Sequence, residues 1–77
     1  MSTINIAATL KRCKIDKLVK RVVRMRQIDQ SIYLVCEARN GQWIYVVDEP
    51  LGFDAIFRET EMQAIMWAPG PVQRGWT

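Results

Sequence analysis

The stretch that decides the fold is EARNGQWIYVVDE, residues 37–49. Asn40-Gly41 lies between two runs rich in residues that favour β-strands, in which every second residue shares a face, and a period of two is typical of β-strands. Asn-Gly is the strongest two-residue hairpin signal, because a type I′ turn needs positive φ at both central positions. The stretch therefore predicts a β-hairpin with a two-residue turn.

Both faces of this hairpin are apolar. In the strand after the turn, one face carries Trp43, Tyr45 and Val47, and the other carries Ile44 and Val46. Two apolar faces mean that both sides of the hairpin are covered, either by the rest of the chain or by a partner. A chain of 77 residues has little left to cover both. We therefore expect an oligomer or a protein-binding surface at this hairpin.

Residues 15–26, IDKLVKRVVRMR, fit two structures. On a helix, one stripe is apolar and carries Ile15, Leu18, Val19, Val22 and Met25. As a strand the alternation is weaker, but the β-branched valines favour it and no Gly, Asn or Pro ends a helix before Ser31. We favour a strand over about 22–27 after a helical or turn segment. The alternative is an α+β fold with an amphipathic helix at about 15–26, packed on a three-stranded sheet.

Turn and helix signals follow the hairpin. Pro50 and Gly52 end it, and residues 55–59 can form a third strand. Thr60 with Gln63 three residues later is a capping-box pattern, which predicts a short helix or 3₁₀ turn over 61–67. Two prolines and two glycines then predict a flexible C-terminal tail over 70–77, after a single small domain over 1–69.

The series GQWIYVVDE…IFRETEMQAI is similar to the end of SH3-like barrels, in which two strands are followed by an acidic position, a 3₁₀ turn and a last short strand. The resemblance covers residues 22–66 at most, and such barrels host many unrelated functions. We predict a mainly β fold with short helical flanks, an antiparallel meander of three to four strands. An SH3-like small barrel is the preferred form, because closure hides the sheet edges.

Basic side chains are concentrated in one segment. Residues 11–26 hold eight basic residues and one acid, which gives +7; three arginines against seven acids elsewhere give −4, and the sum is the net +3. A cationic surface attracts phosphate backbones or an acidic patch on a partner, although a solvated face without a ligand is also typical. The nucleic-acid-binding candidates are Lys14, Lys17, Lys20, Arg21, Arg24 and Arg26.

Tyr33, Trp43 and Tyr45 are the candidates for an interaction surface. Stacking on exposed rings is worth about 1–3 kcal/mol per base, so outward-facing rings would form a stacking platform or a peptide groove. Inward-facing rings are core. We favour the core, because a small protein needs large rings there.

The reactive inventory is poor. The chain has no His, which removes the commonest general base and the commonest metal ligand, and its glycines form no phosphate-binding loop. We expect no enzyme, no cofactor and no metal ion. With no leader-like or membrane-spanning stretch, and with only Cys13 and Cys36, we expect a cytoplasmic protein with reduced thiols.

Two functional hypotheses follow. The first is a small regulatory binding protein that holds nucleic acid on its Lys11–Arg26 surface. The second is a protein-interaction module or inhibitor, of phage or mobile-element origin, that docks through the hairpin face as a homo-oligomer.

Overall fold

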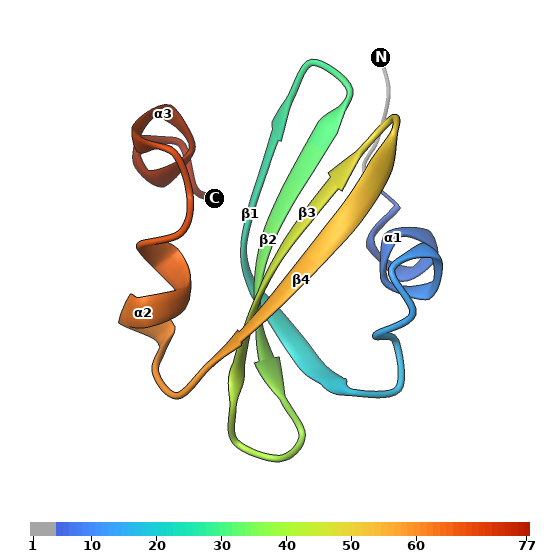
Figure 1. Ribbon diagram of the computed structural model, residues 1–77, viewed down its shortest axis with the longest axis vertical. Coiled ribbons are helices and arrows are strands. Elements are labelled where there is room, and N and C mark those ends of the chain that lie inside the picture. Colours follow the sequence, from blue (N-terminus) through green and yellow to red (C-terminus); the bar gives the residue numbers. More distant parts are fainter. Residues whose placement is uncertain (1–4) are drawn as a thin grey trace.

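Four β-strands form one antiparallel sheet in the order β1-β2-β3-β4, with short helices before and after it (Figure 1). The computed structural model describes residues 5–77. In chain order the elements are α1 (Ile6–Arg12), β1 (Val19–Ile28), β2 (Ser31–Ala38), β3 (Trp43–Glu49), β4 (Gly52–Arg58), α2 (Glu61–Ile65) and α3 (Gly70–Arg74). The predicted mainly β meander with short helical flanks is confirmed.

The sheet is open, and β1 and β4 are its two edges. It does not close into the SH3-like barrel that we preferred. The alternative fold with a helix over 15–26 is wrong, because β1 begins at Val19 and the N-terminal helix ends at Arg12. The predicted capping box is present at α2, where the Thr60 side chain accepts from the Gln63 backbone N–H at 3.2 Å.

Two irregularities in β1 explain why its sequence resembles a helix. Val19, Val22 and Met25 lie opposite Ala38, Cys36 and Leu34, on one face of the sheet. These residues are three apart in β1 but two apart in β2, so the register shifts once between Val19 and Arg21 and again between Val22 and Arg24. Each shift is a β-bulge, in which an extra residue in one strand has no partner of its own. Because of the two bulges, apolar residues three positions apart, a spacing typical of a helix, lie on one face of a strand.

The hairpin between β2 and β3 forms with a different turn from the one predicted. Gly41 has a φ of 89°, and Asn40 is not among the residues with positive φ. The Gly41 N–H donates to the Ala38 carbonyl at 3.1 Å and the Ala38 N–H to the Gln42 carbonyl at 2.8 Å, which leaves a three-residue loop. A two-residue turn would have set Tyr45 opposite Cys36, whereas the actual register sets it opposite Val35.

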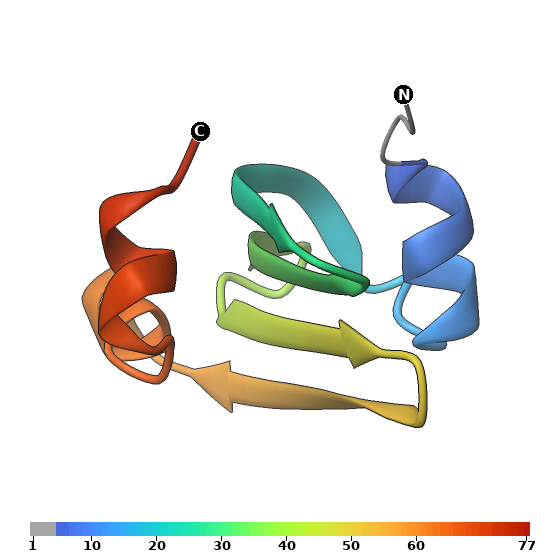
Figure 2. The same cartoon turned by 90° about the horizontal axis from the view of Figure 1, so that it is seen from above.

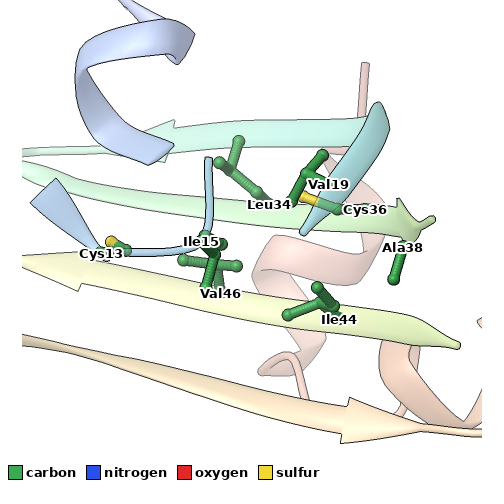
Figure 3. Close-up of a cluster of buried hydrophobic side chains, with 8 residues drawn as sticks. All are labelled: Cys13, Ile15, Val19, Leu34, Cys36, Ala38, Ile44 and Val46. Atoms are coloured by element: carbon green, nitrogen blue, oxygen red, sulfur yellow. The ribbon is translucent and has the colours of Figure 1, made fainter. Parts of the chain in front are cut away.

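Segments from the two ends of the chain cover the two faces of the sheet. Figure 2 shows α1 on one side and α2 with α3 on the other. The first core contains Cys13, Ile15 and Val19 packed on β2 and β3 (Figure 3), and the second contains Ala64, Ala68 and Val72 packed on Val35 and Tyr45. Both faces of the sheet are therefore covered without barrel closure. Our argument that the second hairpin face needs a partner loses its basis.

The last residues pack on the sheet as well. Val72 of α3 is 1% exposed, and Trp76 packs against the second core. The backbone N–H and the hydroxyl of Thr77 both donate to the Met25 carbonyl, at 3.0 and 2.9 Å. The structure therefore places a helix and a buried side chain in the segment for which we predicted a flexible tail. Within residues 5–77, no helix has the length and apolar character needed to cross a membrane.

Candidate nucleic-acid interface

The six basic side chains predicted to bind nucleic acid lie in two different places. Lys14 and Lys17 are in the connection between α1 and β1, Lys20 is at the start of β1, and all three are exposed. Arg21, Arg24 and Arg26 lie opposite Glu37, Val35 and Tyr33 of β2, on the face that α2 and α3 cover. The structure therefore does not bring the six together.

The three β1 arginines already have partners. The Arg21 Nε lies 2.7 Å from a Glu37 carboxylate oxygen, and the Arg24 Nε lies 3.2 Å from Glu61 of α2. The hydrogen bond from Arg21 lowers the pKa of Glu37. The Arg26 guanidinium donates to the Gly75 carbonyl at 3.4 Å. These arginines join β1 to its neighbours and to the C-terminal segment.

The lysines remain, and a fourth cation joins them. Lys14, Lys17, Lys20 and Arg39, which we call the basic end, form no ion pair with any acidic side chain in residues 5–77. The Arg39 N–H donates to the Leu18 carbonyl at 2.9 Å, which holds the β2–β3 loop beside the segment that leads into β1. Two cationic segments far apart in sequence thus meet.

An aromatic side chain lies at the basic end. Lys17, Leu18, Arg39 and Phe57 are among the residues that line a hollow of about 140 Å³. Leu18 is 48% exposed and Phe57 is 39% exposed. Phe57 reaches this place from β4 because it pairs with Ile44, on the face of the first core. Two exposed cations, Lys17 and Arg39, therefore lie beside a partly exposed ring and an apolar surface.

Sequence reasoning missed Leu18, Arg39 and Phe57 as members of this site. Arg39 was assigned to the hairpin, and Phe57 lay in a predicted third strand whose orientation was open. A signal does exist for Phe57, since Phe53, Ala55 and Phe57 alternate and a sheet edge leaves such a row partly exposed.

The three aromatic residues predicted for an interaction surface lie on the opposite face. Tyr45 is 3% exposed, and Tyr33 and Trp43 pack half-buried against the same second core. Burial raises the pKa of Tyr45 to about 12. The core interpretation therefore holds for Tyr45, and none of the three lines the hollow at the basic end.

Other polar groups of the chain serve the fold. Arg12 of α1 pairs with Asp48 of β3, whose side chain is 2% exposed, and this interaction raises the pKa of the guanidinium. Cys13 and Cys36 are free thiols buried in the first core. In the part of the chain that the structure describes, no three His, Cys, Asp or Glu side chains are grouped so that they could hold a metal ion.

Comparison of the chain with protein-family models, with curated proteins and with solved structures finds no match.

Proposed function

We propose that the protein is a small non-enzymatic binding protein that holds a nucleic-acid backbone on its basic end. One observation carries the proposal: Lys14, Lys17, Lys20 and Arg39 are exposed and form no ion pair within residues 5–77, and Lys17 and Arg39 line a hollow with the partly exposed ring of Phe57. Phosphate contacts by such cations release counterions and favour binding. A single strand suits the site best, because an unpaired base can stack on an exposed ring.

The hollow beside Phe57 is compatible with this use. Its volume of about 140 Å³ is close to that of an engineered cavity of about 150 Å³ that admits a benzene molecule. One ring of a base can therefore approach Phe57 while Lys17 and Arg39 contact the phosphates on either side. This arrangement predicts little sequence preference, since neither backbone contacts nor stacking read base edges.

The test is a fluorescence-anisotropy titration of a labelled single strand at several salt concentrations. Four phosphate contacts predict a slope of log K against log salt of about −2.8 for a single strand, or about a 50-fold loss of affinity for a fourfold rise in salt. The variant Lys17→Gln with Lys20→Gln should make the slope of log K against log salt shallower by about 1.4. Phe57→Ala should weaken binding without changing the slope.

A matched control separates the site from the net charge. Arg21→Gln with Arg24→Gln also removes two positive charges, but from the face of the sheet where both side chains are ion-paired. This control should leave the affinity nearly unchanged. Absence of binding at low salt would rule the proposal out. So would an equal loss of affinity in the control pair, because binding would then depend on the charge of the whole protein.

Exposed apolar side chains on α2 and directly after it favour a second function, self-association through this surface. Met62, Met66 and Trp67 are 65%, 70% and 52% exposed. Met66 and Trp67 line a hollow of about 430 Å³ together with Arg58. Large exposed apolar patches mark interaction sites. Sedimentation should show a dimer that Met66→Lys converts to a monomer, whereas a monomer at all wild-type concentrations would exclude this function.

A further inference from the structure

The second face of the sheet carries a cleft that the proposed nucleic-acid site does not use. Its volume is about 380 Å³, and it lies between the strands and the connection from α2 to α3. Three aromatic residues line it, Tyr33, Tyr45 and Trp67, together with two carboxylates, Glu49 and Asp54. Basic side chains are absent from its lining in the described part of the chain. The size falls at the lower end of small-molecule sites, which run from about 300 to 1,000 Å³.

The strand register gathers these groups. Tyr33 of β2 lies opposite Val47 of β3, and Val47 lies opposite Asp54 of β4, so the three form one row across the sheet. Tyr45 and Glu49 are two residues before and after Val47 and share its face. Glu49 also contributes, after burial and Tyr33, to the raised pKa of Tyr45, as expected for a carboxylate close to the phenol. Aromatic rings and negative charge are therefore adjacent.

Trp67 already engages a cation. The guanidinium carbon of Arg58 lies 4.7 Å from the centroid of the Trp67 ring, within the range of a cation–π interaction. Arg58 lines the neighbouring hollow and is not part of the cleft. Trp67 lines both the hollow and the cleft and is 52% exposed, so Arg58 does not cover its side chain completely.

From this juxtaposition we propose that the cleft binds a quaternary ammonium group. Several aromatic rings around one space attract such a cation through their negative faces, and adjacent carboxylates add to the attraction. An anion would be repelled by Glu49 and Asp54, and a neutral apolar ligand would gain nothing from them. The same chemistry occurs in choline-like small molecules and in a trimethylated lysine side chain of a peptide.

The probe is choline, with 3,3-dimethylbutan-1-ol as its neutral counterpart of nearly the same shape. Choline should shift the Trp67 indole N–H signal in a ¹⁵N-resolved NMR spectrum, saturably, and the neutral alcohol should not. The Trp67→Phe spectrum assigns the signal. Replacing both carboxylates, Glu49→Gln with Asp54→Asn, should weaken choline binding by about tenfold or more. The dispersion of the remaining signals shows whether each variant is folded.

Asp29→Asn with Glu59→Gln is the matched control. It removes two charges outside the lining of the cleft and should leave choline binding unchanged. Equal shifts with the neutral alcohol, an equal loss in the control pair, or no shift of the Trp67 signal with choline would each overturn the proposal. A parallel titration with capped trimethyllysine amide identifies the source. Tighter binding than choline assigns the site to a peptide side chain, and weaker binding assigns it to a small molecule.

Discussion

Replacing Val72 tests whether the C-terminal segment stabilises the sheet. Its side chain is 1% exposed and lies in the second core with Val35 and Tyr45. Val72→Ala removes two methyl groups, and their transfer from water contributes about 0.8 kcal/mol each, or about 1.6 kcal/mol together. A residual cavity of roughly 40 Å³ adds about 1 kcal/mol at 24 cal/mol per Å³.

Partial collapse of the short helix α3 lowers this upper value, so we expect a loss of about 1.5–2.5 kcal/mol in the free energy of unfolding. In a domain of this size that corresponds to a fall in Tm of about 6–20 °C. Urea unfolding followed by far-UV circular dichroism measures the loss in the free energy of unfolding. This signal reports mainly on the sheet rather than on tryptophans near the mutated site. Arg74→Ala, an exposed change in the same helix, should stay within about 0.5 kcal/mol of wild type.

A loss below about 0.5 kcal/mol for Val72→Ala would refute the reasoning, since that is the effect of an ordinary surface substitution. The segment after residue 69 would then contribute no packing energy to the fold. Packing of α3 would then also not stabilise the connection from α2 to α3, which forms one wall of the cleft beside Tyr33 and Tyr45.

The remaining predictions concern pH and the hairpin turn. Burial raises the pKa of Cys36 from 9.0 and that of Tyr45 from 10.0, each to about 12. The folded state therefore favours their neutral forms; this contribution is complete below about pH 9 and is lost as the pH rises toward about 12. Urea midpoints should fall over that window, and less steeply in Cys36→Ala with Tyr45→Phe. Gly41→Ala should cost about 1–2 kcal/mol of unfolding free energy in the same assay, because its φ is 89° although no atom lies within 4 Å of an added Cβ; Gly41→Asn should cost less.

The meander was predictable, but its register was not. Periods of two and the turn residues identify β2 and β3, and capping chemistry identifies α2. In β1, two unpartnered residues change the period from two to three, so the apolar spacing by itself resembles that of an amphipathic helix. The signals that favoured a strand were the β-branched valines and the lack of a helix-ending residue before Ser31. At the hairpin, Asn-Gly permits both a two-residue turn and a three-residue loop with Gly41 in positive φ. Tertiary packing selects between them, because the length of the loop sets which face of β3 lies on the same side of the sheet as which face of β2.

The basic segment illustrates the same limit for the candidate site. Counting charges predicted one cationic surface, yet Arg21, Arg24 and Arg26 of β1 share the face that α2 and α3 cover, whereas Lys14 and Lys17 precede the strand. Arg39 and Phe57 join Lys17 only because the hairpin loop and β4 reach the same end of the sheet. Contacts between residues 20 to 40 positions apart follow from strand order, which composition and spacing do not reveal.

The division between arginine and lysine in that segment has a physical basis. Each of Arg12, Arg21, Arg24 and Arg26 donates a hydrogen bond, and three of these bonds join elements distant in sequence. Within residues 5–77 no lysine side chain takes part in a hydrogen bond or an ion pair, and the segment holds Lys11, Lys14, Lys17 and Lys20. A guanidinium presents several donors in a fixed plane and is weakly hydrated, so it suits such contacts, whereas a strongly hydrated ammonium stays in solvent. The arginines thus hold the covering segments on the sheet, and the lysines leave the charge that a ligand can reach.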